Sequence, residues 1–136
     1  PGQAVGFLIP DIAQQVAPVK AGGQVTVRVG YLGTKRDYTD VRDIVRAYTL
    51  LLQKGRAGEA YNICSGVAHS GKEIIDELSR IADVTVTPEI DPALARPSDT
   101  PEIYGSNRKL HKDTGWEPVI PLRTTLADVL ADWRNR

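Results

Sequence analysis

The sequence predicts an α/β chain in which helices and strands alternate. Segments with apolar residues at helical spacing are separated by short runs rich in valine, isoleucine and threonine, which are typical of strands. Glycines and prolines fall between these segments, where turns are needed. The expected order is helix, strand, helix, strand, helix, strand, a proline-bearing loop and two further helices.

The first two elements are short. Pro10 is a favourable first helical residue, and the apolar residues that follow it over 12–16 share one helical face. Residues 24–31 then alternate, with Val25, Val27 and Val29 on one side. This alternation predicts a strand with one buried face.

The central stretch, 36–43, opens the helix around which the chain is organised. Thr39 or Asp40 can cap its first turn, and Gly55 stands where a glycine would end it. Its buried face is expected to consist of Val41, Ile44, Val45, Tyr48, Leu51 and Leu52. Arg36 precedes this helix on an expected loop, where its guanidinium can either face a ligand or stay solvated.

The second half continues the alternation. A strand is expected near 59–65, and Ser70 with Glu73 forms a capping box for the next helix. A short strand over 84–87 should end at Pro88, and a polar, proline-bearing loop occupies 91–101. Asn107 can cap a short helix that Gly115 ends, and Pro121 opens the last helix.

Composition limits the partners. The 136 residues suit one domain, and the 17 basic and 17 acidic residues cancel, so neither a nucleic acid nor an anionic membrane is indicated. No apolar run approaches the roughly 18 residues of a membrane span. A single cysteine excludes an intramolecular disulfide and favours the cytoplasm. The chain has no methionine and opens on a turn, so we expect it to be part of a longer protein.

Several reactive residues are interpreted as non-catalytic. Tyr31 and Lys35 have the Tyr-x-x-x-Lys spacing of a dehydrogenase pair, but they follow a strand and span a glycine, so a shared helix face is not expected. Cys64 is interpreted as a small buried hydrophobe. His69 and His111 lack partners at metal-ligand spacing, and no metal is predicted.

Five motifs, in order, resemble those of extended short-chain dehydrogenase/reductases, the NAD-dependent epimerase/dehydratase family. They are Pro1-Gly2-Gln3, Arg36-Asp37-Tyr38, the Tyr61-Asn62 to Ser65-Gly66 segment, Arg96-Pro97-Ser98-Asp99 and Thr114-Gly115-Trp116. Within the family the chain is most similar to the GDP-sugar branch, the GDP-mannose 4,6-dehydratases and the GDP-4-keto-6-deoxymannose reductases. Asp11, after Pro10, favours the reductases, because dehydratases of this branch tend to carry basic residues there.

The resemblance implies that residues 1–136 form the C-terminal, substrate-binding part of an extended Rossmann-type enzyme, without its N-terminal dinucleotide-binding half. The strand near 59–65 would complete the sheet of that half. The full-length enzyme would use NAD or NADP, and its catalytic Ser/Thr and Tyr-x-x-x-Lys would lie upstream. This chain alone is therefore expected to bind no cofactor and to be inactive, and the enzyme is expected to be a homo-oligomer.

The implied ligand is a nucleotide-diphosphate sugar, with a GDP-sugar favoured. Arg36 and Arg96 would bind the diphosphate, whose oxygens match planar guanidinium groups. Asp99 would lie near the ribose, and Val29 would line the base pocket, with a core valine as the alternative. Two other classes stay open: a non-catalytic nucleotide-sugar binder, and an α/β interaction domain with solvated arginines. An upstream glycine-rich loop would exclude the first, and binding of GDP would exclude the second.

Overall fold

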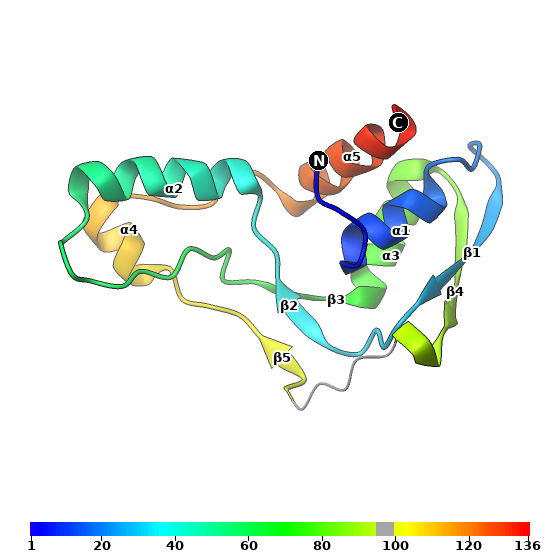
Figure 1. Cartoon of the computed structure of the whole chain (residues 1–136), viewed down its shortest axis with the longest axis horizontal. Coiled ribbons are helices and arrows are strands. Elements are labelled where there is room, and N and C mark those ends of the chain that lie inside the picture. Colours follow the sequence, from blue (N-terminus) through cyan, green and yellow to red (C-terminus); the bar gives the residue numbers. More distant parts are fainter. Residues whose placement is uncertain (95–99) are drawn as a thin grey trace. The chain divides into compact units, whose positions relative to one another are not determined.

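The computed structural model describes residues 1–94 and 100–136, and the chain divides into two compact units (Figure 1). Unit 1 comprises Pro1–Thr34, Ser70–Pro101 and Arg123–Arg136, and unit 2 comprises Lys35–His69 and Glu102–Leu122. Both units contain helices and strands, so the predicted α/β class is confirmed.

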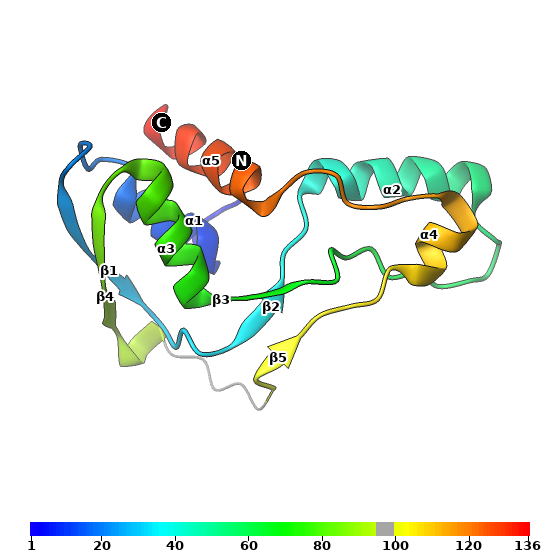
Figure 2. The same ribbon diagram turned by 180° about the vertical axis from the view of Figure 1, so that it is seen from behind.

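Unit 1 is a layer of helices on a parallel strand pair. Strand β1 (Gln24–Val29) pairs with β4 (Thr85–Ile90), and Val27 lies opposite Pro88. Helices α1 (Leu8–Val16) and α3 (Gly71–Ala82) lie side by side against these strands in both views (Figures 1 and 2). The strands are parallel, so the chain must cross over between them, and it passes through α3 before it enters β4.

The core of unit 1 is apolar. It includes the buried residues Ile12, Ala13, Val16, Val27, Val29, Ile74, Ile75, Leu78, Ala82 and Val84, with Leu126, Val129 and Leu130 of helix α5 (Leu122–Arg134). An ion pair between Arg123 and Glu77 joins α5 to α3. The predicted capping box of α3 is confirmed, since Ser70 Oγ accepts from Glu73 N at 3.2 Å and Glu73 accepts from Ser70 N at 2.6 Å. The 3₁₀ helix Pro92–Leu94 follows β4.

Unit 2 combines three very short strands with two helices. The strand order is β3 (Ala68–Ser70), β2 (Lys35–Asp37) and β5 (Glu102–Ile103), with β2 and β5 parallel. Helices α2 (Val41–Lys54) and α4 (Arg108–Thr114) share a small cluster of Ala47, Leu110 and Trp116. Asp40 caps α2 and Gly115 ends α4 with a φ of 76°, as predicted.

The predicted buried face of α2 is largely wrong. Its buried residues are Asp43 and Ala47, and Leu50 and Leu51 pack partly against the same cluster. An apolar stripe stays exposed instead, consisting of Val41, Val45, Tyr48 and Leu52 with exposed fractions of 60%, 57%, 57% and 91%. The reason is that Trp116 and Leu110 pack on the side of the helix that carries Ala47.

Two strand predictions and one loop prediction also need correction. Residues 59–65 form no assigned strand, because the described part of the chain offers them no paired neighbour, and Figure 2 shows plain coil between α2 and β3. Arg36 lies in β2 and not in a loop. Pro88 lies inside β4, which continues to Ile90, and a proline is tolerated there because β4 has one neighbouring strand, β1, in this sheet.

Smaller differences concern element ends. Helix α1 begins at Leu8, two residues before the predicted Pro10, and β1 ends at Val29 and not at residue 31. Asn107 occupies the N-cap position of α4 without a side-chain capping bond. Its Nδ2 donates instead to the carbonyl of Cys64 at 2.9 Å, which ties α4 to the extended segment before residue 65.

Candidate functional site

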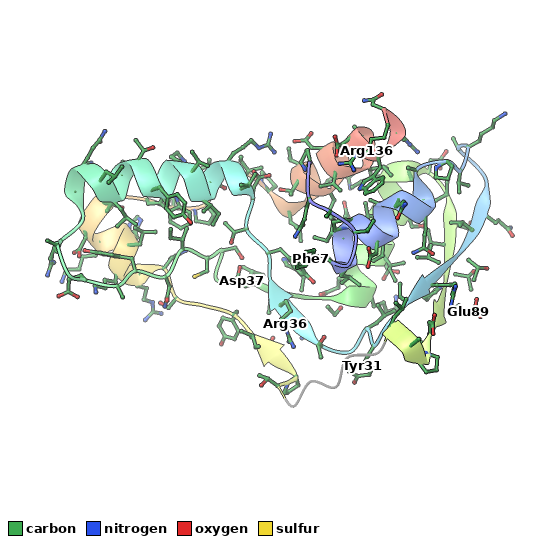
Figure 3. The ribbon with its side chains drawn as sticks, viewed as in Figure 1. Phe7, Tyr31, Arg36, Asp37, Glu89 and Arg136 are labelled. Atoms are coloured by element: carbon green, nitrogen blue, oxygen red, sulfur yellow. The ribbon has the colours of Figure 1, made fainter. Side chains whose placement is uncertain are left out.

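Arg36, the predicted diphosphate ligand, lies at the centre of strand β2. Its backbone is in register with Ile103 of β5. Its half-buried side chain folds along its own strand, where Nη1 donates to the carbonyl of Lys35 at 2.7 Å. Arg36 and Asp37, both labelled in Figure 3, are consecutive residues of β2, and consecutive side chains of a strand point to opposite faces.

Asp37 accepts hydrogen bonds from two distant segments. Its Oδ1 accepts from Ser65 N at 2.9 Å and from Ser65 Oγ at 2.5 Å. Its Oδ2 accepts from Gly66 N at 2.8 Å and from Gly105 N at 3.3 Å. Burial acts to raise the pKa of Asp37, but these hydrogen bonds outweigh burial and hold the pKa below its usual value. The carboxylate therefore stays ionised and joins β2 to the segments that follow residues 64 and 104.

Two positions beside Asp37, Gly66 and Gly105, require glycine for conformational or steric reasons. Gly66 has a φ of +82°, which strongly favours glycine. A Cβ on Gly105 would lie 2.6 Å from Cys64 Sγ, so only glycine lets this segment approach. Burial, followed by the negative charge of Asp37, raises the pKa of the Cys64 thiol. These shifts support the interpretation of Cys64 as a packing residue, because a thiolate is disfavoured there.

The 36–43 stretch contains three further residues with defined surroundings, Tyr38, Asp40 and Asp43. Burial raises the pKa of Tyr38, and the positive charge of Arg36 acts in the opposite direction, so the phenol is protonated at neutral pH. Asp40 Oδ1 accepts from Arg42 N at 2.9 Å at the start of α2. Buried Asp43 accepts through Oδ2 from Val119 N and Ile120 N, both at 3.0 Å.

Asp37 and Asp43 are the residues that sequence reasoning missed. Their backbone N–H donors lie 28 to 77 positions away in the chain, so no local spacing reveals these bonds. The available signal was a set of aspartates three residues apart, at positions 37, 40 and 43, across the start of an amphipathic helix. All three accept backbone N–H groups, which makes them structural anchors of unit 2.

The other predicted ligands are placed differently. Arg96 and Asp99 lie outside the described residues. Val29 belongs to unit 1, where its side chain is 3% exposed in the core and its carbonyl accepts from Asp91 N at 2.8 Å. This burial favours the alternative of a core valine, and a role in a base pocket stays a prediction. The structure does not bring Val29 and Arg36 together within one unit.

Unit 1 contains an open, mostly apolar pocket of about 440 Å³. It is lined by Leu32, Gly33, Lys72, Ile75, Asp76, Val86 and Pro88. The two charged residues in this lining pair with each other, with Lys72 Nζ 2.6 Å from Asp76 Oδ2. The pocket therefore presents apolar walls beside a neutralised ion pair.

The described residues form neither a helical Tyr–Lys pair nor a candidate metal site. Tyr31 lies in a loop and Lys35 begins β2, so they share no helix, as predicted. The described residues hold no group of three or more His, Cys, Asp or Glu that could bind a metal ion. No described helix combines the length and hydropathy needed to cross a bilayer.

Known proteins show clear similarity to this chain. The family model described as GDP-mannose 4,6 dehydratase matches residues 1–129. The chain is 39% identical over 137 aligned positions to GDP-6-deoxy-D-mannose reductase of Pseudomonas aeruginosa. The alignment covers 100% of the chain and 45% of the reductase. The chain thus spans about half the length of this curated relative.

Solved structures agree with this similarity. The structure of RMD from Pseudomonas aeruginosa, complexed with NADPH, matches 100% of the chain and 45% of its own length, with a TM-score of 0.88 and 36% identity. The UDP-glucuronic acid 4-epimerase of Bacillus cereus matches 99% of the chain and 42% of its own length, with a TM-score of 0.82. Its identity is 20%, so this second match shows the fold alone.

Proposed function

Since the chain belongs to the GDP-mannose 4,6-dehydratase family, we propose that it is the substrate-binding part of an NAD(P)-dependent enzyme that acts on nucleotide-diphosphate sugars. The favoured reaction is reduction of a GDP-4-keto-6-deoxy sugar. The observation that carries this choice is 39% identity to a GDP-6-deoxy-D-mannose reductase along the whole chain. The family model itself is described as a 4,6-dehydratase, so dehydration of GDP-mannose is the second candidate.

The residues of this chain do not fit the cofactor. A Rossmann site needs a glycine-rich turn between a strand and a helix, whose N-terminus holds the pyrophosphate. After β1 the chain runs through Gly30 and Gly33 into strand β2, and no helix intervenes. The relative whose structure contains NADPH is more than twice as long as the part that this chain matches. The cofactor would therefore be held by a part of the enzyme outside this chain.

Arg36 is the described residue best suited to the nucleotide. A diphosphate carries about two negative charges, and a guanidinium can donate two parallel hydrogen bonds to its oxygens. We assign Arg36 to the diphosphate, together with Arg96, and Asp99 to the ribose.

Binding measurements on the intact enzyme test this assignment. Arg36→Ala and Arg96→Ala should each weaken binding of a GDP-sugar by roughly 1.5–3 kcal/mol, the usual contribution of a charge-assisted hydrogen bond. Arg36→Lys should recover only part of the loss, because an ammonium group cannot make the forked contact. Arg56→Ala is the matched control, since Arg56 lies in the same unit and pairs with Asp113 at 2.7 Å.

The outcomes of the titration separate the proposals. Isothermal titration with GDP, UDP and a GDP-sugar should show the two losses combining less than additively, because both arginines serve one anion. Unchanged GDP binding by the alanine variants would show that these arginines are surface residues. Equal binding of UDP and GDP would contradict the GDP-sugar assignment and leave the family unaffected. The 136-residue chain alone, supplied with cofactor, should show no turnover.

A further inference from the structure

The carboxylate of Asp37 is the point at which three segments of unit 2 meet. It accepts from Ser65 and Gly66, which follow the extended segment after α2, and from Gly105, which follows β5. The sequence separations are 28, 29 and 68 residues. One side chain therefore fixes three backbone segments that would otherwise be held by strands of two or three residues each.

Arg36 lies directly beside this junction. The backbone of Arg36 is in register with Ile103, the last residue of β5. Its neighbour Asp37 accepts a hydrogen bond from Gly105 N, two residues after the end of β5. A parallel pairing of only two residues has little stability of its own. The bond from Gly105 N to Asp37 Oδ2 therefore stabilises the strand pairing that determines where the Arg36 side chain begins.

Two glycines allow the backbone to come close to the Asp37 carboxylate. Gly66 supplies a left-handed backbone, and Gly105 supplies the space beside Cys64. A larger residue at either position would move an N–H donor away from Asp37. Asp37, Gly66 and Gly105 therefore depend on one another. An aspartate that served only solubility would not need such partners.

We propose that Asp37 is a positioning residue for Arg36: it fixes β2 against Ser65, Gly66 and Gly105 and so holds the Arg36 guanidinium in place for the diphosphate. This inference rests on the proposed function, since it takes Arg36 as the ligand of the nucleotide. A backbone that is already fixed need not be ordered when the anion binds, so the cost of binding is lower. Because consecutive side chains of a strand point to opposite faces, Asp37 need not contact a ligand that Arg36 binds.

The test compares two carboxylates of unit 2 in the intact enzyme. Asp37→Asn keeps the shape of the side chain but removes its charge and one acceptor. Asp113→Asn is the matched control, because Asp113 is also partly buried and accepts from Arg56 at 2.7 Å and Tyr61 at 2.9 Å. GDP and inorganic pyrophosphate are titrated separately by calorimetry. We expect Asp37→Asn to weaken both ligands about tenfold and Asp113→Asn to change either by less than about twofold.

Two further measurements distinguish positioning from general stability. In an Arg36→Ala background, Asp37→Asn should weaken binding by less than about twofold more, because the residue through which it acts is gone. In the protein without ligand, the side-chain N–H signal of Arg36 in ¹⁵N-arginine NMR should lose order in Asp37→Asn and keep it in Asp113→Asn. If Asp37→Asn does not fold, Ser65→Ala removes one of its donors and should give the same pattern with a smaller loss.

Each result decides between the two proposals. If Arg36→Ala weakens binding and Asp37→Asn does not, the positioning role is wrong and the proposed function stands. If the losses of affinity caused by Arg36→Ala and Asp37→Asn multiply in the double variant, the two residues act independently and the positioning role is also wrong. If Arg36→Ala binds GDP and pyrophosphate like the wild type, Arg36 is not the ligand, and the assignment of function to this residue falls together with the inference.

Discussion

The two units of this chain are stabilised by different interactions. Unit 1 buries a continuous set of aliphatic side chains from β1, α1, α3 and α5. Unit 2 has a cluster of only three fully buried apolar residues, Ala47, Leu110 and Trp116. Asp37 and Asp43 instead accept backbone N–H groups from other segments, and Asp40 caps α2 by accepting from Arg42 N. Unit 1 depends on burial of apolar surface, whereas unit 2 depends more on carboxylates that accept backbone hydrogen bonds.

Unit 2 also exposes apolar surface along one helix. In unit 2 the stripe of Val41, Val45, Tyr48 and Leu52 runs along α2, and the extended 59–65 segment has no paired strand among the described residues. We expect a further element to pack on this stripe, and the chain spans only 45% of the length of its reductase relative. The comparison teaches that a small core can be compensated by backbone hydrogen bonds to carboxylates, at the cost of dependence on charge.

Truncation in the core of unit 1 should have the largest effect on stability. Leu78 of α3 is fully buried, so Leu78→Ala leaves a cavity and should lower the free energy of unfolding by about 3 kcal/mol. Chemical denaturation with hydrogen exchange measures the effect. Loss of protection should be concentrated in α1, α3 and α5, and the exposed Glu89→Ala serves as control. An equal loss of protection in α2 and α4 would show that the two units unfold together.

Removal of a carboxylate should have the second largest effect. Asp43→Ala leaves Val119 N and Ile120 N without their acceptor and Arg46 without its ion pair at 2.8 Å. The expected loss is about 2 kcal/mol, because the donors that a buried carboxylate satisfies would lose their acceptor. Fluorescence of buried Trp116, in a Trp133→Phe background, reports on unit 2. A loss below about 0.5 kcal/mol would contradict the dependence on carboxylates.

Sequence patterns predicted the elements that carry local signals. The α2 cap at Asp40, the capping box at Ser70 and the end of α4 at Gly115 follow from side-chain chemistry within four residues, and all three are confirmed. The strands β2 and β5 were missed, because two or three residues are too few to show alternation. The buried face of α2 was wrong, because apolar residues occur on two sides of that helix and tertiary packing alone selects between them.

The candidate site was predictable only in part. Arg36 was identified through its motif, and the structure adds that it lies on β2. The role of Asp37 could not be read from the sequence, because it depends on donors at positions 65, 66 and 105 that meet only after folding. Arg96 and Asp99 stay predictions, since they lie outside the described residues.

Acid should weaken unit 2 through Asp37. The folded pKa of Asp37 lies below its unfolded value of about 4, so its contribution is complete above that value and is lost as the pH falls through the folded pKa. The effect should be smaller than that of Asp43→Ala, because Asp37 is only half-buried. The amide shifts of Gly66 and Gly105 should titrate with a midpoint below about 4, and Asp37→Asn should abolish this titration. A midpoint at or above that value would contradict the assigned hydrogen bonds.

Substitution in the apolar stripe should have the smallest effect on stability and a clear effect on association. Leu52 is 91% exposed, so Leu52→Lys removes no core contact and should change the free energy of unfolding by less than about 0.5 kcal/mol. The 136-residue chain should self-associate through the stripe, because helix faces of this kind normally pack against another element. Sedimentation velocity over a range of concentrations should show weaker association for Leu52→Lys. Gln53→Lys, at the neighbouring exposed position, adds the same charge without removing apolar surface and should associate like the wild type. A wild-type chain that stays monomeric, with a cooperative melt independent of concentration, would show that unit 2 needs no contact beyond those within this chain.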